Sequence, residues 1–246
     1  MPSPMRSLNL AGATNFRDLG GYRAGDGRSV RWRRLFRSDH LADLTRQDRK
    51  VLAELGLSRA FDFRGVQERA AAAYELPGVK QQPLPIEPTV VQNMRPLLEA
   101  GRRLTAQDAV EAMQQTYRAF VHDNASRFAG LFTHLLEDDS PMVFHCTAGK
   151  DRTGFAAALL LHALEVPADV VMEDFLLTNA LYRRPPSPPQ TDVTQEVLDV
   201  LWRVRAEFLE AALHAVDERY GGPDAYLEAL GVGPRERARL AELYLE

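Results

Sequence analysis

One ten-residue segment constrains the fold more than any other part of the chain: His145-Cys146-Thr147-Ala148-Gly149-Lys150-Asp151-Arg152-Thr153-Gly154. It joins a short apolar stretch, 142–145, to a longer one with helical periodicity, 152–164. A strand, a tight glycine-containing loop and a helix fit this pattern. In open α/β sheets such a loop lies at the carboxyl end of a strand, where ligands usually bind.

The loop contains a thiol, Cys146, and a guanidinium, Arg152, with five residues between them in a Cys-x5-Arg arrangement. A phosphate ester carries about two negative charges at neutral pH, so an anionic nucleophile needs a strong positive field to approach it. Inward-pointing N–H groups and the start of the helix supply such a field, and the small Ala148 and Gly149 let the main chain come close. Arg152 can bind two phosphate oxygens, and the same surroundings stabilise the thiolate of Cys146.

These residues predict a phosphomonoester hydrolase that forms a cysteinyl-phosphate and needs an acid to protonate the leaving group. Asp151 is the nearest candidate acid, since its charged neighbours favour ionisation while a bound phosphate favours the protonated form. We expect His145 to orient the loop, and Thr153 to cap a backbone N–H or contact the thiolate. The expected phosphate-binding residues are Thr147, Ala148, Gly149, Lys150, Asp151 and Arg152.

The loop and several other segments resemble the bacterial tyrosine/serine and lipid phosphatases, the dual-specificity family that includes the mycobacterial protein tyrosine phosphatase B. The other segments are Asn15–Tyr22, Arg34–Asp39, Asp62–Arg64 with Glu68, Asp174–Asn179, and Tyr220–Gly222 with Leu230–Gly231. The resemblance implies a protein-tyrosine-phosphatase-like fold with Cys146 as nucleophile and Arg152 as phosphate ligand. It implies Asp151 as the acid, with Lys150 and Asp151 setting the family apart from ordinary tyrosine phosphatases. It also implies phosphotyrosine, phosphoserine/threonine or phosphoinositide substrates.

A second carboxylate, Asp62, is the rival candidate for the acid. It follows a predicted strand in the segment Asp62-Phe63-Arg64. The structural alternative is that Asp62 pairs with Arg64 or with Arg17, and we favour that alternative. Both interpretations remain open at the level of sequence.

The pattern of apolar segments predicts an α/β fold in a single domain, residues 1–246, because a chain of this length need not be divided. Predicted strands lie at 31–36, 58–63, 82–85 and 142–145. Predicted helices lie at 45–55, 105–122, 125–136, 152–164, 168–182 and 195–216, followed by two short ones. This order indicates a central, mostly parallel sheet flanked by helices, with a helical C-terminal half.

Composition excludes several classes of protein. A net charge of −4 argues against a nucleic-acid binder. There is no apolar run of about 20 residues to form an integral membrane segment, and the N-terminus lacks an apolar signal core. One cysteine fits a reducing compartment, so we expect a cytoplasmic location, with secretion by a route that needs no N-terminal signal left open. We find no paired-cysteine metal site or dinucleotide motif, and expect no cofactor and no metal.

Other features admit two interpretations each. The arginines at 28, 31, 33, 34 and 37 could attract acidic substrates, but we favour a solvated face. The proline-rich stretches 83–96 and 183–189 could belong to a lid, but simple connections are favoured. Rival functions for the loop are a phosphate-binding module without turnover, a sulfurtransferase and an arsenate reductase, the last of which would need further redox cysteines.

Overall fold

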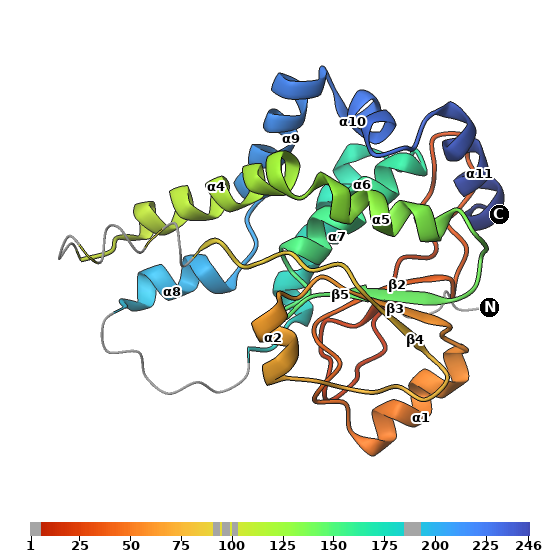
Figure 1. The fold of residues 1–246 in the computed structure, drawn as a ribbon, viewed down its shortest axis with the longest axis horizontal. Coiled ribbons are helices and arrows are strands. Elements are labelled where there is room, and N and C mark those ends of the chain that lie inside the picture. The colour runs from red at the N-terminus through yellow and green to blue at the C-terminus, as the bar shows by residue number, and fades with distance from the viewer. Residues whose placement is uncertain (1–5, 91–93, 95–98, 100–102, 185–192) are drawn as a thin grey trace.

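A five-stranded sheet forms the centre of the computed structural model, which describes residues 6–90, 94, 99, 103–184 and 193–246 (Figure 1). The strand order is β1-β2-β5-β3-β4. The strands are β1 (Arg17–Asp18), β2 (Leu35–Ser38), β3 (Arg59–Asp62), β4 (Lys80–Pro83) and β5 (Met142–His145). Only β1 runs antiparallel to its neighbour, and the remaining pairs are parallel. The predicted mostly parallel sheet is therefore confirmed, with β5 at its centre.

Helix α1 (Arg46–Leu55) covers one face of the sheet. Thr45 caps its N-terminus in a reciprocal capping box with Asp48, and Gly56 ends it in the left-handed region at φ 68°. Its apolar side packs into a core cluster with Phe36 and Val143, which point to this face. Capping residues and hydrophobic spacing together specify this helix at both ends.

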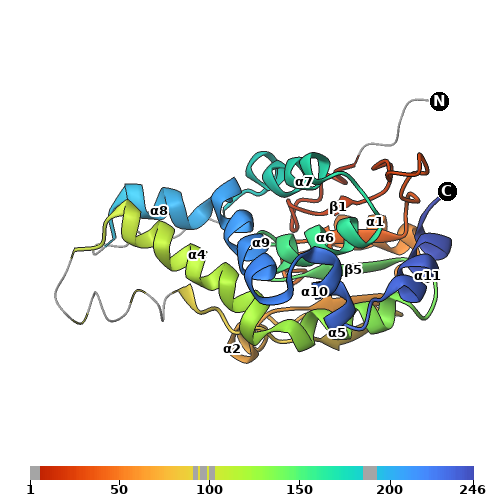
Figure 2. The ribbon, with the colours of Figure 1, turned by 90° about the horizontal axis from the view of Figure 1, so that it is seen from above.

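The opposite face carries a larger core and most of the helices (Figures 1 and 2). Leu35, Phe61 and Phe144 point to this side, because successive residues of a strand alternate between the two faces. The remaining helices are α2 (Val66–Ala71), α4 (Ala106–Asp123), α5 (Ala125–Leu135), α6 (Arg152–Ala163), α7 (Ala168–Leu181), α8 (Gln195–Trp202), α9 (Ala206–Tyr220), α10 (Pro223–Ala229) and α11 (Pro234–Tyr244). Helices therefore flank both faces, and every described element after β5 is helical, as expected.

Helix α6 is the central helix, and its burial explains its composition. Eleven of its residues are buried, including the charged Arg152 at its start. Gly154 is required by close packing, since a Cβ there would lie 2.9 Å from the ring of Phe175 on α7. The helix thus lies against the sheet with its N-terminus directly after the loop that follows β5.

The structure corrects two predictions about secondary structure. The predicted helix at 195–216 is two helices, α8 and α9, separated by extended backbone at Arg203 and Arg205. The Asn179 side chain bonds both the N–H and the C=O of Val204 in this break, at 2.9 and 2.8 Å. Apolar periodicity cannot reveal such competition from a distant side chain. Strand β1 was not predicted, because two residues at a sheet edge leave no periodic signal.

Helices α4 and α8 lie side by side and extend beyond the edge of the sheet (Figures 1 and 2). Much of the two proline-rich stretches, 91–93, 95–96 and 185–189, lies outside the described residues. Within the described residues, none of the helices is long and apolar enough to span a bilayer.

Candidate active site

The loop after β5 forms the floor of a cavity of about 1010 Å³. Cys146 begins this loop, and only 2% of its surface is exposed. The other loop residues on the cavity are Thr147, Ala148, Lys150, Asp151 and Arg152. The sequence-predicted loop residues are therefore brought together around one concave space.

The loop conformation depends on Gly149, which lies in the left-handed region at φ 64°. A Cβ at this position would lie 2.3 Å from the carbonyl oxygen of Ser38 at the end of β2. Any larger residue would both strain the backbone and collide with the neighbouring strand. The glycine of the motif is thus explained by the turn and by the close approach of β2.

Carbonyl groups of the loop are held from outside the cavity. Asn15 donates from Nδ2 to the carbonyl oxygens of Ala148 and Gly149, both at 3.0 Å, and Arg37 donates to the latter at 2.9 Å. Because C=O and N–H point in opposite directions across a planar peptide, the N–H groups that follow point away from Asn15. Within the described residues, the N–H groups from Thr147 to Arg152 donate no hydrogen bond. They are therefore available to an anion.

A buried charge cluster beneath the loop supports this arrangement. Arg17 and Arg37 are both fully buried and share one carboxylate, Asp174, with N–O distances of 3.0 and 2.6 Å. Burial lowers the pKa of Arg37 to about 10, so it stays protonated near neutral pH. Burial alone would raise the pKa of Asp174, but the two guanidinium groups hold it well below its ordinary value. This cluster carries one excess positive charge that favours an anion in the loop.

The cluster decides between the two arginines expected near Asp62 and corrects one expectation about Arg37. Arg17 pairs with Asp174 on α7 and not with Asp62. Arg37 is buried under the loop, so the solvated-face interpretation is wrong for it. A fully buried guanidinium is uncommon, and the partner of Arg37, Asp174, lies 137 positions away in the chain.

Arg152, the first residue of α6, is fixed by Glu68 of α2. Its Nη1 and Nη2 donate to the two carboxylate oxygens at 2.6 and 2.9 Å, and the Thr147 hydroxyl donates to the same carboxylate. Burial would lower the pKa of Arg152, but the hydrogen bonds to Glu68 raise it above its ordinary value. Burial likewise opposes ionisation of Glu68, yet Arg152 lowers its pKa to about 2. Nothing in the sequence around Glu68 predicts this role.

The carboxylate of Asp151 has a donor on each oxygen. Lys150 Nζ lies 2.6 Å from Oδ2, and the Tyr117 hydroxyl of α4 donates to Oδ1 at 3.0 Å. Asp151 occupies the N-cap position of α6, but its side chain makes no capping hydrogen bond and lines the cavity instead. Thr153 is buried, and its hydroxyl has no hydrogen-bond partner within the described residues. The contacts expected of Thr153 are absent because it lies inside the helix, beyond the capping position.

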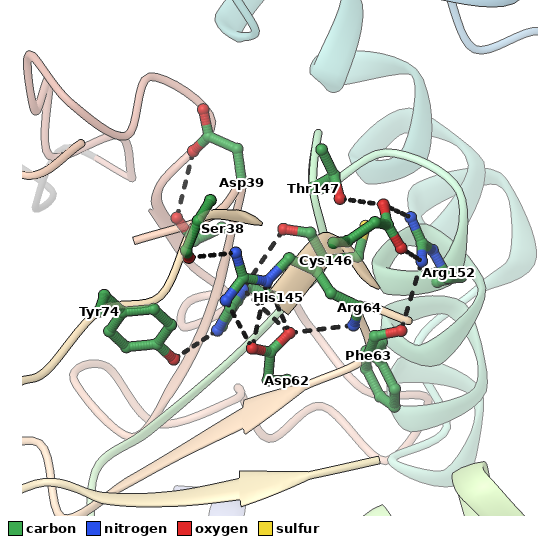
Figure 3. Close-up of polar contacts among 12 residues, drawn as sticks. Ser38, Asp39, Asp62, Phe63, Arg64, Tyr74, His145, Cys146, Thr147 and Arg152 are labelled. Atoms are coloured by element: carbon green, nitrogen blue, oxygen red, sulfur yellow. Dashed lines mark hydrogen bonds and ion pairs between the residues drawn. The ribbon is translucent and has the colours of Figure 1, made fainter. Parts of the chain in front are cut away.

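The rival carboxylate Asp62 is held by Arg64 (Figure 3). It receives the Arg64 backbone N–H and guanidinium at 2.8 to 3.1 Å, and among the described residues it is not part of the cavity lining. Burial opposes ionisation, but Arg64 and His145 lower the pKa of Asp62. The structure therefore contains the ion pair between Asp62 and Arg64, which was the favoured alternative to a role for Asp62 as the acid.

His145 lies next to Asp62, behind the loop. Its Nε2 lies 2.6 Å from the Tyr74 hydroxyl, and its Nδ1 lies 3.3 Å from the carbonyl oxygen of Cys146. Burial lowers the pKa of His145 to about 4, so the ring is neutral near neutral pH. These contacts fit a residue that orients the loop.

Apolar side chains from two helices form the outer walls of the cavity. Met113 and Phe120 come from α4, and Leu198, Leu201 and Trp202 come from α8. Sequence analysis missed these residues because nothing in the chain indicates that α4 and α8 meet above the loop.

Comparison with known proteins places these features in a family context. The sequence matches the profile of the tyrosine phosphatase family over residues 8–246. A candidate tyrosine-protein phosphatase of Cupriavidus necator is 35% identical over an alignment of 225 residues, which covers 87% of this chain and 80% of that protein. The triple specificity protein phosphatase PtpB of Mycobacterium tuberculosis is 31% identical in an alignment 272 positions long, which covers 93% of this chain and 95% of PtpB.

Among solved structures, P. aeruginosa TpbA in complex with pTyr matches 88% of this chain and 99% of its own. The sequences are 15% identical and the TM-score is 0.36.

Proposed function

Because the chain belongs to the tyrosine phosphatase family, we propose that it hydrolyses phosphomonoesters through a cysteinyl-phosphate on Cys146, with phosphotyrosine in proteins as the principal substrate. One observation carries the proposal. Cys146 lies at the floor of a cavity, in a loop whose carbonyls are held outward by Asn15 and Arg37. The unpaired N–H groups and the guanidinium of Arg152 then surround a phosphate placed above the sulfur.

In the first step the Cys146 sulfur attacks phosphorus, and the bond from phosphorus to the leaving oxygen breaks. Asp151 donates its proton to that oxygen and becomes a carboxylate. In the second step a water molecule attacks phosphorus, the P–S bond breaks, and Asp151 takes a proton from the water. The N–H groups and Arg152 stabilise the charge on the transferring oxygens in both steps.

Asp151 is preferred to Asp62 as the acid on geometric grounds. Asp151 lines the same cavity as Cys146, whereas Asp62 is not among the described residues that line it. An acid must come within hydrogen-bond reach of the leaving oxygen, directly or through one water. The position of Asp151 on the cavity allows this, and the position of Asp62 outside the cavity lining opposes it.

The cavity supports a substrate with a sizeable apolar group attached to its phosphate. Apolar side chains of α4 and α8, including Phe120 and Trp202, continue from the loop into the outer walls. An aromatic ring such as that of phosphotyrosine fits walls of this kind. The relative PtpB is named a triple specificity protein phosphatase, and we extend the proposal to phosphoserine and phosphothreonine.

Phosphoinositides are the second candidate substrates. The buried Lys150 beside the loop arginine adds a positive charge for further phosphates, and the apolar outer wall suits the lipid portion. Turnover of phosphoinositides in the substrate panel described below would support this second candidate.

The test is a panel of phosphopeptides, phosphoinositides and nitrophenyl phosphate. We expect turnover of phosphotyrosine peptides and nitrophenyl phosphate, abolished by Cys146→Ser. A phosphate-binding module would retain phosphate binding without turnover, and a sulfurtransferase would instead transfer sulfur from thiosulfate.

The acid is tested with a matched pair of variants, Asp151→Asn and Asp62→Asn. Asp151→Asn should lower kcat by about 10²- to 10⁴-fold on alkyl phosphates and far less on nitrophenyl phosphate, whose leaving group needs little protonation. Equal losses on both substrates would contradict the role of Asp151. A leaving-group-dependent loss in Asp62→Asn alone would transfer the role to Asp62.

A further inference from the structure

Tyr117, a fully buried residue of α4, has its hydroxyl on the candidate acid. The hydroxyl donates to Oδ1 of Asp151 at 3.0 Å. The ring packs among phenylalanines, with centroid distances of 5.1 Å to Phe120, 6.1 Å to Phe175 and 5.9 Å to Phe208. A phenylalanine would satisfy this apolar packing equally well, so the hydroxyl is explained only by its contact with Asp151.

We infer that Tyr117 is a positioning residue that fixes which oxygen of Asp151 exchanges the proton with substrate. This inference rests on the proposed function, in which Asp151 is the acid. In a protonated carboxyl group, one oxygen carries the proton and the other accepts hydrogen bonds. Because the Tyr117 hydroxyl donates to Oδ1, Oδ1 is the acceptor and Oδ2 carries the acidic proton. Oδ2 is then the oxygen that serves the leaving group.

The role of Lys150 follows from the same geometry. Its Nζ lies 2.6 Å from Oδ2, so the ammonium group occupies that oxygen when no phosphate is bound. A phosphate dianion in the loop offers Lys150 a competing partner of greater charge. Oδ2 can then carry a proton while Tyr117 keeps the carboxyl group in place.

Tyr117 is chemically unchanged in both steps of the proposed hydrolysis. As the P–O bond breaks, the proton on Oδ2 moves to the leaving oxygen, and the new carboxylate keeps the hydrogen bond from Tyr117. As water attacks and the P–S bond breaks, a water proton returns to Oδ2. The hydroxyl stabilises the carboxylate that exists between the two steps and gives up no proton itself, since burial and the negative charge of Asp151 raise the pKa of Tyr117 well above its ordinary value.

The test is the variant Tyr117→Phe, with Tyr226→Phe as the matched control. Tyr226 is also fully buried, but its hydroxyl has no hydrogen-bond partner within the described residues. We expect Tyr117→Phe to lower kcat on alkyl phosphates by about 10- to 100-fold and on nitrophenyl phosphate by less than about 3-fold, the range for loss of one hydrogen bond to a charged group. Tyr226→Phe should leave both rates near those of the wild type.

A structural effect of the substitution is distinguished by the same measurements. Equal losses on the two substrates in Tyr117→Phe would overturn the inference, because a damaged fold affects all leaving groups. So would wild-type rates on both. Retained turnover of nitrophenyl phosphate shows that the variant is folded.

The double variant Asp151→Asn/Tyr117→Phe separates this inference from the proposed function. If Tyr117 acts through Asp151, the double variant should be no slower than Asp151→Asn alone. Additive losses would overturn the inference while leaving the acid assigned to Asp151. Absence of any leaving-group dependence in Asp151→Asn would instead overturn the acid assignment of the proposed function.

Discussion

Replacement of Asn15 by alanine tests whether outward anchoring of the loop creates the anion site. The fully buried Asn15 side chain donates to the carbonyl oxygens of Ala148 and Gly149 at 3.0 Å. In Asn15→Ala the Gly149 carbonyl keeps Arg37 as a donor, but the Ala148 carbonyl loses the donor it has in the described structure. The substitution also removes Oδ1, which accepts a hydrogen bond from Arg17 Nη1. Two lost hydrogen bonds whose partners keep another contact cost about 1 kcal/mol each, and one unsatisfied buried carbonyl costs about 1–3 kcal/mol, so the free energy of unfolding should fall by about 3–5 kcal/mol.

The larger consequence concerns anion binding. Once released, the Ala148 carbonyl can turn toward the cavity, which replaces an N–H donor to the anion by an acceptor. Loss of one charge-assisted hydrogen bond, about 1.5–3 kcal/mol, weakens vanadate binding by about 10- to 100-fold. Inhibition of nitrophenyl phosphate hydrolysis by vanadate measures this, and the small anion avoids contributions from the outer walls of the cavity.

Asn179→Ala is the matched control for Asn15→Ala. Its side chain also makes two hydrogen bonds to main chain, but to Val204 between α8 and α9. Urea unfolding should show a comparable loss of stability in both variants, whereas only Asn15→Ala should weaken vanadate. An equal change of vanadate affinity in both would refute the reasoning, since the effect would then follow from general destabilisation.

Two further predictions concern the charged groups around the loop. Asp174→Asn should lower the free energy of unfolding by about 3–5 kcal/mol, because it leaves Arg17 and Arg37 buried without their shared carboxylate. Urea unfolding measures this free energy, and a loss below about 1 kcal/mol would contradict the account. For Glu68, a folded-state pKa of about 2 lies below the ordinary value of about 4.3, so its contribution to stability is complete above pH 4.3 and is lost as pH falls through 2. The stability difference between wild type and Glu68→Gln should therefore narrow over that range in acid unfolding, and a constant difference would count against the ion pair with Arg152.

Local signals in the sequence predicted the parts of the fold that depend on neighbouring residues. Thr45 and Gly56 mark the two ends of α1, and Thr105 marks the start of α4, as the structure confirms. The loop after β5 could also be located, because strand, glycine and helix follow one another directly. The break between α8 and α9 could not, since it depends on Asn179, which lies 25 positions away from Val204.

In the candidate site, too, the residues that could be predicted are those signalled by their near neighbours in the chain. The sequence predicted Cys146, Arg152 and Asp151 because they share one short loop. It gave no role to Glu68 and none to Tyr117, whose partners lie 84 and 34 positions away in the chain. Arg37 was misinterpreted, since nothing in its own segment indicated that Asp174 would meet it beneath the loop. Contacts between distant segments are set by the packing of the sheet and its helices, which a single sequence does not display.

The most direct test of the central claim is alkylation of Cys146 by iodoacetamide at pH 6, followed by mass spectrometry with and without vanadate. The chain contains one cysteine, so the modification reports on this site alone. If the loop holds an anion above the sulfur, alkylation should proceed at this pH and vanadate should suppress it. Failure of iodoacetamide to modify Cys146 at pH 6, with no protection by vanadate at higher pH, would contradict the account.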